Sequence, residues 1–252
     1  MSGDQNPQLS LVIPAYNEER RLPASLVDVK TFFTKMPLPL EVLVIVETSS
    51  DKTLEKAREV VKHDPRFTIV DNRVHKGKGF AVKSGMLKAR GEIVFFMDAD
   101  LSTPLAEIIK FLGHFADNPK TDVIIGSRAD AKSQVVKRQT LFRQTLGRGF
   151  NKFVQLFGIR GIKDTQCGFK AFRARACREV FSRQTLNGFA FDVEVLLLAQ
   201  KMGFKIDILP VRWVNSTDSK VRIFIDPLKM LFDLLRIRHL VRKTLRAKPL
   251  AP

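Results

Sequence analysis

The feature that most constrains this fold is a series of short apolar runs separated by helical patterns through the first 130 residues. Each run is a nearly continuous stretch rich in Val, Ile, Leu and Phe, which is typical of parallel strands buried on both faces. The predicted strands are Leu9–Pro14, Glu41–Glu47, Thr68–Val70, Glu92–Asp98 and Asp122–Gly126.

Helical periodicity fills the gaps between these runs. Apolar residues recur there at spacings of three and four, as in helices that pack one face onto a sheet. The predicted helices are Glu18–Phe33, Asp51–His63, Phe80–Ala89 and Leu105–Phe115. This order predicts an α/β fold with a mostly parallel open sheet and helices on both faces. Ligands of such sheets bind beyond the carboxyl ends of the strands.

The pattern changes after Gly126. We expect a basic helix, a polar loop, two more helices and a last strand, over residues 134–157, 158–172, 173–182, 191–202 and 205–215. Because no linker, repeat or low-complexity tract interrupts the chain, one domain is predicted over residues 1–220, with an extension over residues 221–252.

Basic residues are unevenly distributed along this chain of net charge +17. Residues 128–183 hold 14 Lys and Arg against 3 Asp and Glu, and residues 220–252 hold 9 against 2. Such asymmetry favours a polyanionic partner, such as nucleic acid, anionic lipid or a phosphorylated substrate, although a solvated basic surface is the alternative. Nucleic acid is disfavoured because the chain has one Trp, one Tyr and no recognised reader motif.

The extension is predicted to form a basic amphipathic helix from Ile223 to about Leu245. Such a helix lies in a membrane interface or packs on its own domain. No run of 18 or more apolar residues is present, so no membrane span is expected. The two cysteines form neither a disulfide framework nor a zinc site. We therefore expect a cytoplasmic protein, peripheral at the cytosolic face of a membrane and in contact with its anionic surface.

Two acidic residues follow the fourth predicted strand, in Asp98-Ala99-Asp100. Alternate residues of an extended segment point the same way, so both carboxylates can converge on one hard cation. Mg²⁺ or Mn²⁺ there can bridge diphosphate oxygens and neutralise charge on a departing nucleoside diphosphate. The alternative is a solvated acidic turn that caps the next helix.

A second candidate site is the segment His75-Lys76-Gly77-Lys78-Gly79, directly before a predicted helix. Glycines allow close backbone approach, lysines supply charge and a helix N-terminus adds its dipole, so the segment resembles a phosphate cradle. Its spacing is not that of a Walker motif. A basic turn is the alternative.

Taken in order, these motifs and several others resemble one known family. The first set comprises Val12–Glu18, Ser50–Thr53, Gly77–Gly79, Asp98–Asp100 and Gly126–Arg128. It resembles the family-2 inverting glycosyltransferases with the GT-A (Rossmann-like) fold. The second set comprises Asp164–Lys170 (D-T-Q-C-G-F-K), Phe189–Glu194 and Ser219-Lys220. It is similar to the dolichyl-phosphate β-glucosyltransferases of that family, and the match covers roughly residues 9–240.

The resemblance implies roles for individual residues. Those expected around the donor nucleotide are Pro14, Ala15, Tyr16, Asn17, Glu18, Glu47, Lys78, Asp98 and Ala99. Asp98 and Asp100 are expected to hold the metal ion. Those expected to bind the acceptor phosphate are Arg128, Arg143 and Lys220, since guanidinium suits bidentate phosphate contact. The residues expected at the reacting centre are Asp100, Arg128 and Asp164, the last either orienting the acceptor or acting as a base.

The implied function is transfer of a hexose, glucose from UDP-glucose, to a polyprenyl phosphate of the dolichyl type, with inversion. The family usually has two aspartates, glycine and serine after the second strand, where this chain has Val46-Glu47-Thr48-Ser49. That departure leaves the nucleoside base open, so a GDP-mannose-dependent mannosyltransferase is one alternative. Transfer to a non-lipid acceptor is another, and a basic nucleic-acid-binding protein is the non-enzymatic one.

Overall fold

The computed structural model describes residues 7–36, 38–135, 154, 159, 161–214 and 225–246. Its centre is a seven-stranded sheet with the order β3-β2-β1-β4-β7-β5-β8. The strands are β1 Leu9–Ala15, β2 Leu40–Val46, β3 Phe67–Asp71, β4 Ile93–Met97, β5 Val123–Ser127, β7 Phe169–Arg173 and β8 Ile206–Pro210. A small second sheet pairs β6 Gln134–Val135 with β9 Arg212–Trp213. All five strands predicted in the first half are therefore confirmed.

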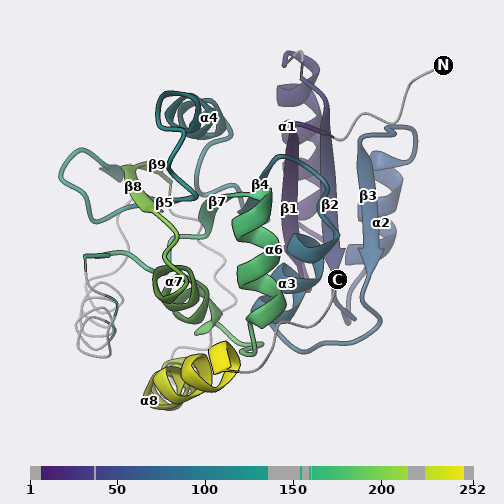
Figure 1. The fold of residues 1–252 in the computed structure, drawn as a ribbon. Helices are drawn as coiled ribbons and strands as arrows, with labels where there is room; N and C mark the ends of the chain where they lie inside the picture. Colours follow the sequence, from purple (N-terminus) through teal and green to yellow (C-terminus); the bar gives the residue numbers. More distant parts are fainter. Residues whose placement is uncertain are drawn as a thin grey trace.

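Helices cover both faces of the large sheet (Figure 1). They are α1 Leu22–Thr34, α2 Thr53–Val61, α3 Lys78–Lys88, α4 Glu107–Asp117, α6 Ala174–Arg183, α7 Phe191–Lys201 and α8 Ile225–Arg246. One core layer lies between the sheet and α1, α2 and α4. The other lies between the sheet and α3, α6, α7 and α8. Strand residues alternate between the two layers, so the predicted two-sided α/β sheet is confirmed.

The prediction for the second half was partly wrong. A helix was expected over residues 134–157, but its first two residues form β6; of the others only Val154 lies within the described residues. The last predicted strand is divided, because β8 ends at Pro210 and the chain then enters the small sheet as β9.

Strand β7 was expected to be loop, and it determines the shape of the sheet's centre. It runs antiparallel to β4 and to β5, whereas the other pairings in the large sheet are parallel. Met97 pairs with Phe169, so the start of β7 lies at the carboxyl end of β4. The segment before β7 is thereby carried to the edge at which ligands of an α/β sheet bind.

The extension forms α8, which packs against α7 (Figure 1). Leu234, Ile237 and Val241 of α8 are buried in the core layer, while Phe232 and Leu235 are exposed. No helix in the described part of the chain is long and apolar enough to cross a membrane.

Candidate active site

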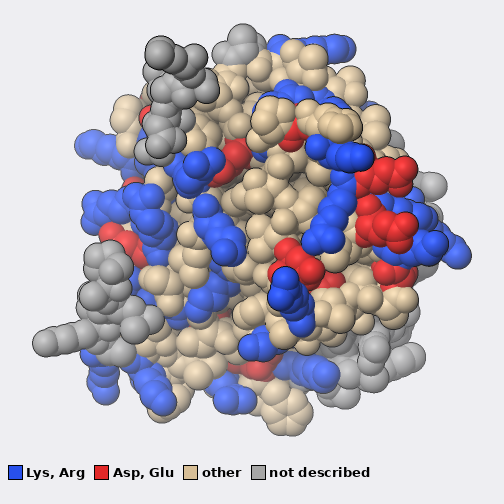
Figure 2. Space-filling model, turned by 90° about the vertical axis from the view of Figure 1, so that its right-hand side faces the viewer, with Lys and Arg blue, Asp and Glu red and all other residues tan. Residues whose placement is uncertain are grey.

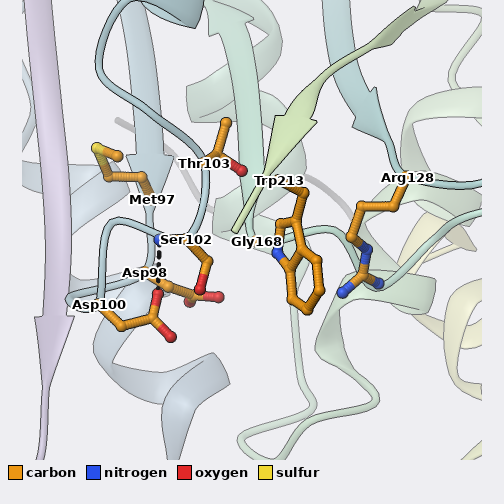
Figure 3. Close-up of a pocket in the computed structure, with 8 residues that line it drawn as sticks. All are labelled: Met97, Asp98, Asp100, Ser102, Thr103, Arg128, Gly168 and Trp213. Atoms are coloured by element: carbon orange, nitrogen blue, oxygen red, sulfur yellow. Dashed lines mark hydrogen bonds between the residues drawn. The ribbon is translucent and has the colours of Figure 1, made fainter. Parts of the chain in front are cut away.

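A pocket opens at the carboxyl ends of β4 and β5 (Figure 3). The chain brings four separate segments to it: the turn after β4, the residue after β5, the residue before β7 and the tip of β9. Its lining residues are Met97, Asp98, Asp100, Ser102, Thr103, Arg128, Gly168 and Trp213. The acidic turn and the guanidinium of Arg128 lie on opposite sides of Trp213 in this view.

Asp98 lies at the end of β4 and is held from two sides. Its Oδ1 is 2.5 Å from Nζ of Lys78, the first residue of α3. The backbone of Gly168 lies against the other side, where an added Cβ would be only 2.0 Å from Oδ2 of Asp98. Residue 168 must therefore lack a side chain for this carboxylate to keep its place.

Asp100 follows in the same turn and is half-exposed. Its Oδ1 accepts a hydrogen bond from the amide of Ser102 at 2.9 Å, which orients the carboxylate (Figure 3). Its Oδ2 is 3.9 Å from Nη1 of Arg21. Both carboxylates of the predicted metal site are thus brought to one pocket.

Arg128 follows β5 and forms a bidentate ion pair with Asp164. Nε donates to Oδ2 and Nη2 to Oδ1, each at 2.8 Å, and the amide of Arg128 also donates to Oδ2 at 2.8 Å. The guanidinium carbon lies 5.4 Å from the ring centroid of Trp213. Burial by itself raises the pKa of Asp164, but the charge and hydrogen bonds of Arg128 outweigh it and hold that pKa below its usual value. Asp164 is therefore a weak base that orients Arg128.

A second ion pair lies behind the pocket, between β7 and the first turn of α7. Nζ of Lys170 is 2.5 Å from Oδ1 of Asp192, and it also donates to the carbonyl of Cys167 at 2.6 Å. Nearby, the Glu194 carboxylate accepts hydrogen bonds from the amides of Thr185 and Leu186. Asp192 and Glu194 thus have interior partners.

The loops after β1, β2 and β3 lie together, as the resemblance implied. The ring of Tyr16 stacks on that of His75, with centroids 3.7 Å apart and an angle of 8° between the planes. Asn17 accepts a hydrogen bond from the amide of Ser50 at 2.8 Å, and the amide of Glu18 donates to Thr53 at 2.7 Å. Asn17 has a φ of 53°, a left-handed conformation that Asn tolerates better than most residues. This region offers an aromatic platform for a nucleoside base.

Glu47 is buried at the end of β2, and both of its oxygens already have partners. One accepts hydrogen bonds from the amides of Lys76 and Gly77, and the other lies 2.8 Å from Nδ1 of His75. Glu47, which departs from the family pattern, therefore holds the loop after β3 by hydrogen bonds. It also contacts His75, whose ring stacks on Tyr16.

The predicted phosphate cradle before α3 is largely closed. An added Cβ at Gly77 would lie 2.8 Å from the carbonyl oxygen of Asn187, and one at Gly79 would lie 2.6 Å from that of Leu186. Gly77 also has a φ of 114°, which favours glycine. The glycines serve to pack the start of α3 against the segment before α7, and Lys78 is the member that faces the acidic turn.

Several site residues were not singled out from the sequence. Trp213 lies at the site but in no quoted motif, whereas Gly168 and His75 lie in quoted segments that gave neither of them a role of its own. The strong D-T-Q-C-G-F-K motif was the available signal for Gly168 and Lys170. Arg143 and Lys220 lie outside the described residues, so their roles stay predictions.

The donor atoms of the acidic turn fit a divalent cation. Asp98 and Asp100 supply hard oxygen ligands, and Mg²⁺ is usually held by one or two carboxylates with substrate phosphates completing its shell. Among the described residues, no group of three or more His, Cys, Asp and Glu forms a self-sufficient metal site. A metal here would therefore share its coordination with a phosphate ligand.

The chain is similar in sequence to proteins of one known family. The sequence pattern of "Glycosyl transferase family 2" matches residues 10–181. "Dolichyl-phosphate beta-glucosyltransferase" of Drosophila melanogaster is 36% identical over 247 residues, covering 93% of this chain and 76% of that protein. The protein of the same name from Homo sapiens is 33% identical over 242 residues, covering 92% and 75%.

Solved structures show the same fold at low sequence identity. Glucosyl-3-phosphoglycerate synthase from Mycobacterium tuberculosis, in complex with Mn²⁺, UDP-glucose and glycerol 3-phosphate, has a TM-score of 0.68 and 17% identity, covering 92% of this chain and 80% of that one. Mannosyl-3-phosphoglycerate synthase from Rubrobacter xylanophilus has a TM-score of 0.66, also at 17% identity, covering 97% and 77%. The predicted GT-A fold is confirmed, and this chain is a member of glycosyl transferase family 2.

Proposed function

We propose that this enzyme transfers glucose from UDP-glucose to a polyprenyl phosphate of the dolichyl type, with inversion at the anomeric carbon. The observation that carries the proposal is one pocket that has the two carboxylates of Asp98 and Asp100 on one side and the oriented guanidinium of Arg128 on the other. The names of the relatives that are about one-third identical over nine-tenths of this chain support glucose and dolichyl phosphate.

At the donor side, the stack of Tyr16 on His75 would receive the base, and Asp98 and Asp100 would hold a divalent cation. That cation, Mg²⁺ or Mn²⁺, supplies neutralisation of the charge on the departing nucleoside diphosphate. Lys78 adds a positive charge beside the same turn. These residues position the donor and stabilise the leaving group.

At the acceptor side, Arg128 binds the phosphate. A phosphate monoester is ionised at neutral pH, so its oxygen attacks the anomeric carbon without a strong general base. Asp164 suits this mechanism because its lowered pKa makes it a poor proton acceptor, while its two hydrogen bonds hold the guanidinium plane. Asp164 is thus a positioning residue.

A transfer assay tests the proposal. UDP-glucose and GDP-mannose are offered separately with a short-chain polyprenyl phosphate and Mn²⁺ or Mg²⁺, and the glycolipid product is measured. We expect product from UDP-glucose, metal dependence and loss on adding a chelator. 3-Phosphoglycerate serves as a soluble control acceptor. Product only from GDP-mannose overturns the donor assignment, and product only with 3-phosphoglycerate overturns the lipid acceptor.

We also infer that α8 holds the enzyme at an anionic membrane surface, where a lipid acceptor resides. Its outward side combines the apolar Phe232 and Leu235, 68% and 56% exposed, with the exposed Arg236, Arg238 and Arg242. Apolar residues flanked by basic ones are typical of interfacial helices, and each basic residue near such a surface adds about 1 kcal/mol. Lys and Arg are also widely scattered over the face in Figure 2.

Co-sedimentation with vesicles tests this surface. We expect binding to vesicles of phosphatidylcholine and phosphatidylserine, weaker binding to phosphatidylcholine alone, and loss of binding in Phe232→Ser/Leu235→Ser. Ile109→Ser is a matched control, because Ile109 is a similarly exposed apolar residue on α4. Equal binding of the wild type and the double variant to the vesicles would show that α8 does not make the membrane contact.

A further inference from the structure

The Lys170–Asp192 pair is an unusual feature of the core. Lys170 is 0% exposed and Asp192 is 2% exposed, and their charged atoms are 2.5 Å apart. Removing two charges from water costs more free energy than a surface ion pair does, and apolar replacements of such a pair are often neutral or stabilising. Stability alone is therefore a weak explanation for the pair.

Two contacts connect this pair to the pocket. Nζ of Lys170 donates to the carbonyl of Cys167, the residue before the glycine that lies against Asp98. On the other side, the neighbours of Asp192 and Lys78 along the chain are in contact, since an added Cβ at Gly79 would lie 2.7 Å from Cβ of Phe191. Burial by itself lowers the pKa of Lys78, but the negative charges of Asp98 and Asp192 outweigh it and raise that pKa above its usual value. Asp192 thus places a second negative charge near the lysine that binds Asp98.

The charges explain why a second partner matters. Lys78 and Lys170 with Asp98, Asp100 and Asp192 make two positive and three negative charges, a formal net of −1. A divalent cation held by Asp98 and Asp100 would compete with Lys78 for the Asp98 carboxylate. The negative charge of Asp192 would offset part of the repulsion between that cation and Lys78.

We propose that Asp192, held in place by Lys170, is a positioning residue that keeps Lys78 at the site when a divalent cation and the donor diphosphate bind. The inference rests on the proposed donor site and deepens it. Asp192 itself touches neither the metal nor the donor. Asp192 would balance the charge of Lys78 when Asp98 binds the divalent cation, so that Lys78 remains available to the diphosphate.

The test removes both buried charges together, in Lys170→Met/Asp192→Asn, so that neither is left unpaired. The chain has a single tryptophan, and because Trp213 lines the pocket, its fluorescence reports binding of Mn²⁺ and UDP directly. We expect Mn²⁺ to bind about 10- to 100-fold more weakly in the presence of UDP, the usual effect of removing a support behind a metal site. The KM for the donor should rise more than kcat falls.

Glu41→Gln is the matched control. Glu41 is a buried carboxylate that is bonded to Ser10 and Arg90 at the opposite end of β2, away from the pocket. Its replacement should leave the affinity for Mn²⁺ and UDP unchanged. The melting temperature of each variant separates altered binding from lost folding.

A further comparison tests the route through Lys78. Lys78→Met is measured alone and combined with Lys170→Met/Asp192→Asn. If Asp192 acts through Lys78, the pair's removal should cause little additional loss of affinity in the Lys78→Met background. If the losses of Mn²⁺ affinity caused by Lys78→Met and by Lys170→Met/Asp192→Asn add fully, the proposal is overturned. Unchanged Mn²⁺ binding in the Lys170→Met/Asp192→Asn variant, or failure of that variant to fold, would overturn it as well. A wild-type protein that binds no Mn²⁺ with UDP would instead overturn the donor site itself.

Discussion

The two sides of this site are built in different ways. The nucleotide side uses the loops after β1, β2 and β3, three neighbouring parallel strands, joined mainly by hydrogen bonds and one aromatic stack. The phosphate side surrounds β7, an antiparallel strand, and is joined by ion pairs at 2.5–2.8 Å. We propose that the first side binds the nucleoside of the donor and that the second binds the phosphate groups.

This difference predicts which side of the site is more sensitive to mutation. The ion pairs of the phosphate side are wholly or partly buried, and the energy of such a pair depends strongly on distance because less water screens its charges. A stacked platform tolerates small displacements better, because its contact is spread over a ring. We therefore expect the phosphate side to respond to single substitutions with larger losses than the nucleotide side.

The largest effect is expected at the metal site. Asp100→Ala removes one of two carboxylates that face the donor diphosphate, and we expect kcat/KM to fall about 10³-fold, the upper range for a single electrostatic group. Transfer assays over a range of Mn²⁺ concentrations measure this loss. Activity within a few-fold of the wild type would place the metal elsewhere.

The next effect tests whether β7 sets the geometry. Gly168→Ala adds a Cβ that collides with the Asp98 carboxylate, and a displacement of about 1 Å can lower a rate about 10²-fold. Gly113→Ala is the matched control, because a Cβ there meets nothing within 4 Å in an exposed part of α4. Circular dichroism should show both variants folded. Equal activities would mean that the close packing at residue 168 has no functional role.

A smaller effect is expected on the nucleotide side. Tyr16→Ala removes half of the aromatic stack, and we expect the KM for UDP-glucose to rise about 10-fold, as for loss of one base-stacking contact of 1–3 kcal/mol. The value of kcat should hardly change, and Tyr16→Phe should retain the low KM. A loss confined to kcat would contradict a role in donor binding.

The last effect concerns stability and its dependence on pH. Because the pKa of Asp164 is lowered in the folded protein, its ion pair contributes stability that is fully present above the unfolded value of about 3.9 and is lost as pH falls through the folded value. Urea unfolding should show Asp164→Asn to be less stable than the wild type at pH 7. The difference should narrow below about pH 4, and a constant difference would exclude the charge as its cause.

The sequence by itself was enough to predict the α/β class, the five strands of the first half and the acidic turn after β4. These depend on local patterns: a continuous apolar run predicts a buried strand, and the residue after it must lie at the sheet's edge. The closeness of the loops after β1, β2 and β3 was predictable for the same reason, since consecutive strand–helix units place their loops together.

Only the tertiary structure showed that β7 inserts antiparallel between β4 and β5, because strand direction and partner depend on contacts across long separations in the chain. That insertion brings Gly168 to Asp98 and Asp164 to Arg128. It also buries Lys170 beside Asp192, a pairing that no local spacing reveals. The sequence named most of the chemical groups of this site, and the folding of distant segments decided which groups face each other, because charge pairing acts through space.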